Sequence, residues 1–363
     1  MKAILLTSLL FLPIIATAQT AAPVVTRTAA ITGQGYFPVA QRLHDGRIAV
    51  IMRGGAEHLG LKGRLDMIFS SDEGKTWSKP VVVNDSPIDD RNPALGVAKD
   101  GTMVVGFWRT ATYDETGKYN PKLTDKERST WVTRSKDGAT WSEATQIDTS
   151  EIELGSPFGR MITLPDGTML MPIYGYEVRP AGKKLTSDRN HSYIYRSTDN
   201  GQTWKRLSEI GDGKQQLNET AIERLASGKI IAAMRSRAGE VWLSESADNG
   251  ATWSKTKQLS PVNAHPADLC LLPDGRILMT IGNRIGADAN FGVFGLVSDA
   301  SGSFALEKRF PLVTDALSRD CGYPSSVVLK DGRALTLYYA TRVKEHPEWK
   351  VHCGALVFDV PKP

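Results

Sequence analysis

Apolar and polar residues alternate in short runs along most of the chain, and glycine-centred polar turns separate these runs in pairs. Alternation with a period of two is typical of β-strands that bury one face. An apolar run, a turn of the Asp-Gly type and a second apolar run occur six times, with turn glycines at Gly46, Gly101, Gly167, Gly228, Gly275 and Gly332. Asp-Gly between apolar runs is the strongest short hairpin signal, and both central turn residues are expected to have positive φ.

The spacing of these hairpins indicates a repeated architecture. The turn glycines lie about 57 residues apart on average, which leaves room for about four strands in each repeat. Hardly any helical periodicity occurs between them. The sequence therefore predicts an all-β protein, a six-bladed β-propeller with four-stranded antiparallel blades.

A second motif of serine, aspartate, glycine, threonine and tryptophan falls between the hairpins. It runs from Ser70 to Trp77, with further copies at 135–141, 197–204 and 246–253 and a decayed copy at 298–304. The Ser and Asp side chains are expected to bind turn amides, while glycine takes the left-handed position and tryptophan packs beneath. We therefore interpret these motifs as structural.

The first 22 residues differ from the repeats that follow. Met1-Lys2 provides a positive start, residues 3–15 are apolar, and residues 16–18 (Ala-Thr-Ala) resemble a small-residue cleavage site. The apolar run is too short for a membrane-spanning helix, and no other stretch is long enough to form one. We predict a signal peptide cleaved after Ala18, a leader that ends at residue 22, and a single propeller domain over 23–363. The mature protein is then exported, to the periplasm or outside the cell.

Composition limits the ligand classes. The 363 residues carry a net charge of +4 with no basic block, which does not suggest nucleic acid binding, although a small positive excess suits an acidic ligand. The three cysteines, Cys270, Cys321 and Cys353, form no metal-ligand spacing, and we expect buried structural thiols, although one pair could be oxidised after export. No metal site and no cofactor are predicted.

The hairpins place particular side chains at one end of the propeller. The residue nine or ten before each turn glycine and the residue seven after it should lie at the same sheet edge, because the chain runs in to the turn and back out. On the first strands these positions hold Tyr36, Arg91, Pro157, Glu219, His265 and Tyr323; on the return strands they hold Arg53, Trp108, Tyr174, Arg235, Gly282 (with Arg284 just beyond) and Tyr339. Six such edges meet at one mouth, so arginines and aromatic rings collect where a ligand would bind.

The SxDxGxTW turns are Asp-boxes, and with six hairpins they resemble the sialidase (neuraminidase) superfamily over roughly residues 30–360. Asn218-Glu219, followed by Arg235, resembles the glutamate that activates the catalytic tyrosine and the second arginine of the carboxylate-binding triad. Gly322-Tyr323 resembles the strand that carries the nucleophilic tyrosine, and Arg284 takes the place of the third arginine.

The resemblance implies an exported, retaining exo-α-sialidase-like glycosidase that releases a terminal acidic sugar from a glycan, with sialic acid as the default. A neutral phenol approaches an anionic sugar with less repulsion than a carboxylate would. Because the unperturbed pKa of tyrosine is about 10, Glu219 is expected to take the proton of Tyr323.

The chain departs from the family at two places. Sialidases begin blade one with an Arg-Ile-Pro-type motif, whereas this chain has Tyr36-Phe37-Pro38, so Tyr36 replaces the first arginine. Arg53 or Arg91 could supply a relocated guanidinium, since bidentate arginine is the natural carboxylate ligand.

The second departure concerns the general acid. The loop that carries an aspartate in sialidases has none here, and the candidate proton donors are Glu57, His58 and Asp90. The remaining predicted substrate-binding residues are Tyr36, Trp108, Tyr174 and His265.

Two other functions fit the same residues. A propeller lyase or hydrolase could act on uronic-acid-containing polysaccharide through His58 or His265 and a tyrosine, and would tolerate the missing arginine. A non-catalytic glycan-binding propeller would not need Glu219, Arg235 and Tyr323 together.

Overall fold

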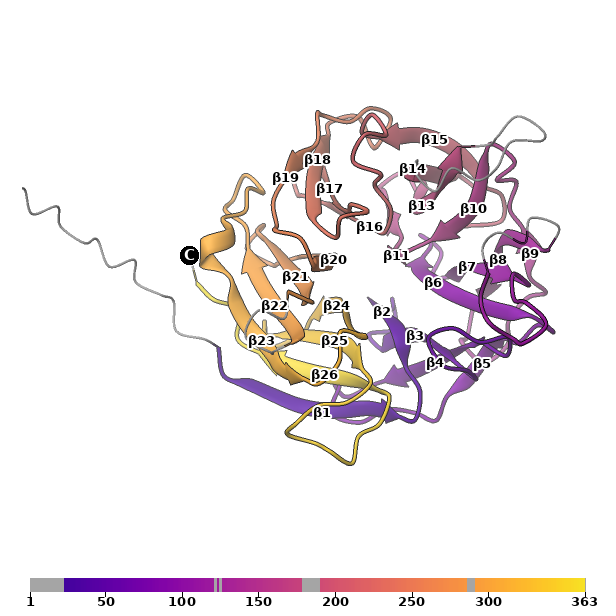
Figure 1. Ribbon diagram of the computed structural model, residues 1–363. Helices are drawn as coiled ribbons and strands as arrows, with labels where there is room; N and C mark the ends of the chain where they lie inside the picture. Colours follow the sequence, from indigo (N-terminus) through magenta and orange to yellow (C-terminus); the bar gives the residue numbers. More distant parts are fainter. Residues whose placement is uncertain (1–22, 121–122, 124–125, 178–189, 286–290, 363) are drawn as a thin grey trace, which may run out of the picture.

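Six antiparallel sheets surround a central axis in the computed structural model, which describes residues 23–120, 123, 126–177, 190–285 and 291–362 (Figure 1). The prediction of an all-β, six-bladed propeller is confirmed. The predicted leader, residues 1–22, lies outside the described residues, and the predicted domain boundaries stay predictions. Within the described part of the chain, none of the helical segments is long and apolar enough to cross a membrane.

Each blade follows the chain outwards from the axis, strand by strand. Blade 1 contains β2 (Tyr36–Arg42), β3 (Ile48–Gly54), β4 (Arg64–Ser70) and β5 (Val81–Asn84). Blade 2 contains β6 (Asp89–Val97), β7 (Met103–Thr110), β8 (Arg128–Ser135) and β9 (Thr145–Gln146). Blade 3 contains β10 (Ile152–Pro157), β13 (Met169–Glu177), β14 (Asn190–Ser197) and β15 (Lys205–Ile210).

The second half of the ring has the same order. Blade 4 contains β16 (Thr220–Arg224), β17 (Ile230–Arg235), β18 (Val241–Ser246) and β19 (Lys257–Gln258). Blade 5 contains β20 (Ala264–Leu271), β21 (Ile277–Asn283), β22 (Phe291–Val297) and β23 (Phe310–Ala316), with a 3-10 turn η1 (Leu306–Lys308). Blade 6 contains β24 (Cys321–Val328), β25 (Ala334–Ala340) and β26 (His352–Phe358), completed by β1 (Val25–Thr32).

The first strand of the chain closes the ring. β1 pairs antiparallel with β26 and forms the outer edge of blade 6, where indigo lies beside yellow in Figure 1. Arg27 on β1 also donates two hydrogen bonds of 2.7 and 2.9 Å to Asp315 on β23 of blade 5. Residues from both ends of the described chain therefore hold the last blade in place.

The hairpin turns form where predicted, but their geometry differs from the expected two-residue turn. In the first hairpin the Gly46 amide donates to the Leu43 carbonyl (3.0 Å), and the Leu43 amide donates to the Arg47 carbonyl (2.8 Å). Only the glycine has positive φ (89°), while Asp45 accepts a hydrogen bond from the Arg47 amide (3.0 Å). This is a three-residue loop in which glycine forms a bulge, so the aspartate is selected for its side-chain acceptor.

The Asp-boxes connect the third and fourth strands of their blades, as in the β4–β5 turn. The Ser70 hydroxyl accepts a hydrogen bond from the Gly74 amide (2.8 Å), and Asp72 accepts from the Thr76 amide and hydroxyl (2.9 and 2.6 Å). In the decayed fifth copy the Gly302 amide donates to the Asp299 carbonyl instead (3.1 Å). The structural interpretation of the motif is confirmed.

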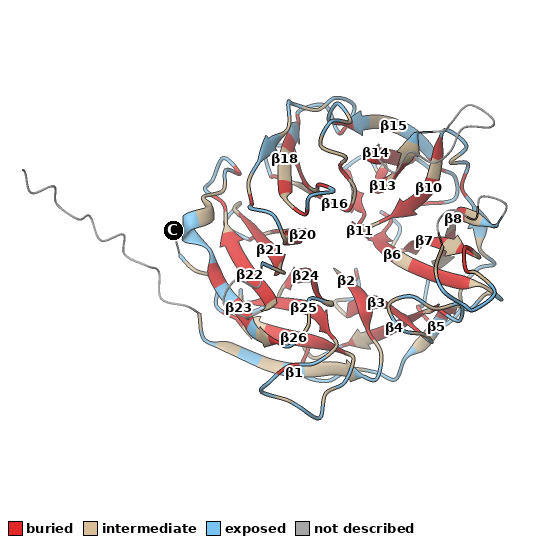
Figure 2. Ribbon diagram, viewed as in Figure 1, coloured by how far each residue is buried: buried red, intermediate tan, exposed pale blue. Residues whose placement is uncertain are grey.

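The hydrophobic core lies between the blades. Six clusters of buried side chains each take residues from two neighbouring sheets, one cluster for each blade interface. In Figure 2 the inner strands are largely buried and exposure increases toward the rim. The three cysteines are buried and unpaired, as expected for structural thiols, and burial raises the pKa of Cys270 to about 12.

A buried ion pair joins three blades below the mouth. The inner strand of blade 3 breaks into β10, β11 (Gly159–Arg160) and β12 (Ile162–Thr163), and β11 pairs in parallel with β6. Arg160 thereby reaches both carboxylate oxygens of Asp268 on β20 (2.9 and 3.0 Å), and Asp268 also accepts from the Ser326 amide on β24 (2.8 Å). These contacts give the site above them a rigid floor.

Candidate functional site

The first strand of five blades carries an irregularity where it reaches the mouth. Register shifts occur in β2, β6, β10, β20 and β24. Proline lies in each of these strands, which is compatible with a strand whose inner edge faces the axis. Phe37, Asn92 and Tyr323 occupy the same bulge position with φ of 54°, 51° and 50°. The positive φ of Tyr323 is therefore shared with the equivalent residues of blades 1 and 2. This backbone conformation belongs to the repeat, and the bulge directs side chains toward the axis.

The pairing predicted across the hairpins is confirmed. Tyr36 pairs with Arg53 and Arg91 with Trp108. The Arg235 amide donates to the Glu219 carbonyl (3.0 Å), which places these two residues side by side at the same end of blade 4.

The most connected group at the mouth is centred on Tyr323. Its hydroxyl donates a 2.6 Å hydrogen bond to Glu219 Oε1, and Arg235 Nη1 donates a 2.8 Å hydrogen bond to Glu219 Oε2. Arg284 lies over the Tyr323 ring at 5.1 Å and is fixed by two hydrogen bonds to the Cys321 carbonyl (3.0 and 2.6 Å). Burial and the charge of Glu219 raise the pKa of Tyr323 well above its usual range, so the resting phenol is protonated.

Two glycines allow blades 5 and 6 to approach each other beneath this group. A Cβ atom on Gly322 would lie 3.0 Å from the Gly282 Cα, and one on Gly282 would lie 2.5 Å from the His265 carbonyl. Gly322 also has φ of 96°, which favours glycine. A side chain at either position would push Arg284 and Tyr323 apart.

The blade 4 and blade 5 side of the mouth is electropositive. His265 is buried, and its burial and the charges of Arg235 and Arg284 lower its pKa to about 2. The imidazole is therefore neutral at physiological pH and leaves the two guanidinium groups as the positive charges of this wall. Tyr174 lies on the neighbouring blade 3, where burial and the charge of Glu219 raise its pKa.

A second hydrogen-bonded group lies on the blade 6 and blade 1 side. His58 Nδ1 is 2.6 Å from Asp320 Oδ1, and the Tyr339 hydroxyl donates to the same oxygen at 2.6 Å. Burial alone would raise the pKa of Asp320, but the hydrogen bonds from His58 and Tyr339 outweigh it and the pKa is lowered. Asp320 is thus an ionised acceptor that orients the ring of His58.

Aromatic rings connect the two groups. The Phe37 ring lies 4.9 Å from His58 and 4.8 Å from Tyr323, and Tyr339 lies 5.6 Å from Tyr323. Tyr36, which replaces the family's first arginine, packs against Tyr339 at 5.2 Å. The residue at the position of the family's first arginine therefore belongs to a group of aromatic rings between the Tyr323 phenol and the His58 imidazole.

Arg53 does not join the group at the mouth. Its side chain is 0% exposed and bonded to Asp89 (2.7 Å) and the Gly60 carbonyl (2.9 Å), with further hydrogen bonds to the carbonyls of Ala56 and Glu57. The guanidinium thus lies beneath the loop over 54–63, which carries His58, and supports this loop. Its two terminal nitrogens donate to protein acceptors and the side chain is fully buried, so it is not placed to bind a substrate carboxylate.

We expect Arg53→Leu to destabilise the fold. Removing Arg53 leaves Asp89 with only the more distant guanidinium of Arg91 (3.6 Å), and loss of one partner of a buried pair costs up to about 3–5 kcal/mol. Urea unfolding would measure this loss, with Arg47→Leu, a partly exposed arginine in the first hairpin turn, as the control. An unchanged unfolding free energy, combined with weaker binding of acidic ligands only, would contradict the supporting role and favour the carboxylate-binding role.

The other predicted residues divide between the mouth and its surroundings. Arg91 is buried at the mouth, 5.7 Å from the ring of Trp108 behind it, and its Nη1 makes no hydrogen bond. Asp90 lies away from the group, since its carboxylate accepts hydrogen bonds from Asn84, Ser86 and Arg109. Glu57 is exposed at the rim. Of the two guanidiniums considered as replacements, that of Arg53 is turned beneath the loop, whereas that of Arg91 lies at the mouth with its Nη1 3.6 Å from Asp89 Oδ2.

Asp320 is the residue that sequence reasoning missed. It lies three positions before Tyr323, as Asp89 lies three positions before Asn92 at the same bulge of blade 2. Extending the hairpin comparison by three residues would have found both carboxylates. Within the described ranges, no three His, Cys, Asp or Glu side chains gather as metal ligands would.

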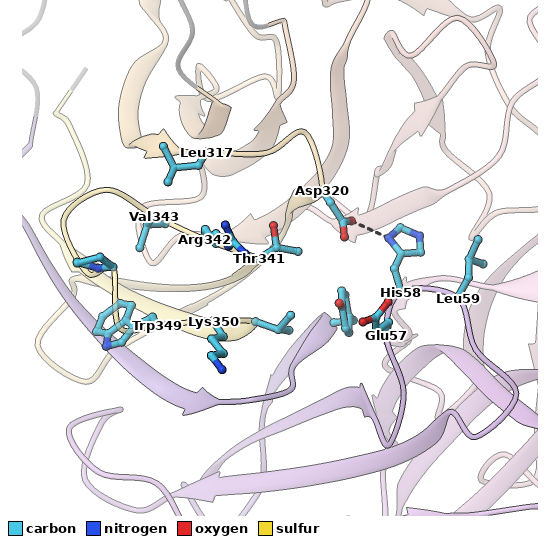
Figure 3. Close-up of a pocket in the computed structure, with 13 residues that line it drawn as sticks. Glu57, His58, Leu59, Leu317, Asp320, Thr341, Arg342, Val343, Trp349 and Lys350 are labelled. Atoms are coloured by element: carbon cyan, nitrogen blue, oxygen red, sulfur yellow. Dashed lines mark hydrogen bonds and ion pairs between the residues drawn. The ribbon is translucent and has the colours of Figure 1, made fainter.

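An open groove of about 1030 Å³ begins at Tyr36, His58 and Asp320 and extends outwards over blade 6 (Figure 3). Its other walls come from Leu317 and from the loop over 341–351. Glu219 and Tyr323 are not among its lining residues, so the groove lies beside the hydrogen-bonded group around Tyr323 and does not contain it.

The sequence model of the family described as "BNR repeat-like domain" matches residues 68–337. The chain belongs to this family. The BNR propeller is 26% identical over 204 residues to a sialidase of Paraclostridium sordellii, covering 51% of this chain and 48% of that protein. It thus spans about half the length of this curated relative.

Solved structures show the same fold. A protein of unknown function from Dyadobacter fermentans matches with a TM-score of 0.77 and 21% identity, covering 94% of this chain and 99% of that one. The NanB sialidase of Streptococcus pneumoniae matches with a TM-score of 0.65 and 13% identity, covering 92% and 70%. The predicted resemblance to a sialidase-like propeller with BNR repeats is confirmed at the level of family and fold.

Proposed function

We propose that this BNR propeller is a retaining glycosidase of the sialidase type, which releases a terminal acidic sugar from a glycan. The observation that supports the proposal best is the chain of hydrogen bonds Tyr323–Glu219–Arg235, with Arg284 over the phenol. A buried tyrosine whose hydroxyl donates to a carboxylate is arranged to lose its proton to that carboxylate when a substrate arrives.

In the first step, the Tyr323 oxygen attacks the anomeric carbon while Glu219 takes the phenol proton. The bond from that carbon to the leaving oxygen breaks, and protonated His58 gives its proton to this oxygen. In the second step, water attacks the anomeric carbon while His58 takes a proton from the water. The bond from that carbon to the Tyr323 oxygen breaks, and Glu219 returns its proton to Tyr323. Two inversions at one carbon retain its configuration.

The acidic group of the sugar would bind the guanidiniums of Arg235 and Arg284, with Arg91 as a third donor from blade 2. Charge-assisted hydrogen bonds from arginine are the strongest that a carboxylate can receive. Tyr36 offers a phenol where the family has an arginine, so the terminal sugar is sialic acid or a related ulosonic or uronic acid. We also propose that the protein is exported, because its sequence predicts a signal peptide.

The test is hydrolysis of aryl glycosides of sialic acid and of a uronic acid, followed by proton NMR of the first-formed sugar. Release of the free sugar with retained configuration is the expected result. An unsaturated uronide with new ultraviolet absorbance would instead favour a lyase that uses His58 and a tyrosine. Binding without turnover of either class would favour a non-catalytic glycan-binding propeller.

A further inference from the structure

The groove beside the proposed catalytic group is not used by the terminal sugar. It begins at His58 and Asp320 and continues to the loop over 341–351, so any chain on the oxygen protonated by His58 would extend into it (Figure 3). Its volume of about 1030 Å³ reaches the upper end of the range for small-molecule pockets, about 300–1,000 Å³, and leaves room for more than one sugar ring.

The walls of the groove combine apolar and cationic groups, with the carboxylates of Glu57 and Asp320 confined to the end near His58. Leu317 is 51% exposed, and Pro347 and Trp349 provide further apolar surface. The Trp349 ring is held in place by a stack on His346, with ring centroids 3.8 Å apart. Such surfaces pack against the C–H faces of sugar rings without restricting the sequence of sugars.

Two cations of the groove lack a partner of opposite charge. Arg342 and Lys350 are exposed and line the groove, and neither makes a salt bridge within the residues that the structure describes. The acidic residues of the same loop have other contacts, since Glu345 lies 2.8 Å from Arg27 and Glu348 pairs with His346 at 3.3 Å. The carboxylate of Asp320 is bonded to His58.

We infer that this groove binds the leaving-group side of the substrate, and that this part of the glycan is itself acidic, carrying a carboxylate or sulfate that Arg342 and Lys350 recognise. The inference rests on the proposed function, because the groove is assigned to the leaving-group side from the place of His58, the proposed proton donor, in its lining. It adds a substrate class: an oligosaccharide with acidic groups on both sides of the bond that is cleaved.

The test uses the double variant Arg342→Ala/Lys350→Ala. Its control is Lys255→Ala/Lys308→Ala, which removes the same charge from exposed lysines outside the groove and its loop. Three substrates share a terminal sialic acid and differ in the leaving group: an aryl sialoside, sialyllactose and a linear sialic acid trimer. Exposed ion pairs are weak, so we expect kcat/KM for the trimer to fall about three- to tenfold in the groove variant, and to change less than twofold for the other two substrates. The loss should diminish at high salt.

Equal loss for the trimer and sialyllactose, or no loss for either, would overturn the inference. Binding of the trimer to the Tyr323→Phe background, measured by calorimetry, separates this result from failure of the proposed function. If no substrate is cleaved, weaker trimer binding in the groove variant alone still supports an acidic glycan site, whereas equal binding in both double variants rejects it.

Discussion

Glu219→Gln and Tyr323→Phe are each expected to lower kcat by at least about 10³-fold while the propeller stays folded. Tyr323→Phe removes the attacking oxygen, and Glu219→Gln leaves a hydrogen-bond partner that cannot take a proton. Matched controls are Glu223→Gln on the same strand, β16, and Tyr338→Phe on β25, since the partly buried Glu223 and the buried Tyr338 both lie outside the Tyr323 group. Steady-state kinetics with an aryl sialoside, beside thermal unfolding, measures both effects.

The double variant decides whether the two residues act as one unit. Since either change disables the same nucleophile, Glu219→Gln/Tyr323→Phe should lose little more activity than the worse single variant. Losses that add in full would mean that Glu219 and Tyr323 act in separate steps. A loss of activity in the Glu223→Gln control as large as in Glu219→Gln would mean that burial of charge, and not proton transfer, explains the effect.

The fold could be predicted because its information is local and repeated. Each blade needs a hairpin turn and most need an Asp-box, and both depend on side chains that bond amides within a few residues, as Asp45 and Asp72 do. The strand register follows from the turn, so the positions opposite one another at the mouth could be counted from the glycine. That counting placed Glu219, Arg235 and Tyr323 at the same end of their blades, and the structure joins them by hydrogen bonds.

Counting along a strand gives a position but not the direction of a long side chain. Arg53 lies opposite Tyr36 as expected, yet its guanidinium turns beneath the loop over 54–63, because Asp89 and the loop carbonyls provide acceptors there. Asp90 was expected near the mouth and instead bonds the segment around Ser86. These outcomes depend on contacts between blades 1 and 2, which no pattern within one repeat encodes.

Counting along the chain could not identify the general acid either, because its partner comes from a blade that is distant in sequence. His58 lies in the loop where the family has its acid, but only the fold brings Asp320, about 260 residues away in sequence, within 2.6 Å of its Nδ1. This pairing keeps the other ring nitrogen available to the groove that His58 lines. A carboxylate–imidazole pair can therefore replace a single aspartic acid as proton donor.

We expect His58→Gln to lower kcat/KM by about 10²–10⁴-fold for sialyllactose, whose leaving alcohol needs a proton, and far less for an aryl sialoside with a good leaving group. Asp320→Asn should act in the same direction with a smaller effect, because it disturbs the orientation of the ring without removing it. His44→Gln, in the first hairpin turn, is the matched control. Equal losses on both substrates would assign His58 to binding or folding. No loss on either substrate would transfer the acid role to Glu57, which lines the same groove.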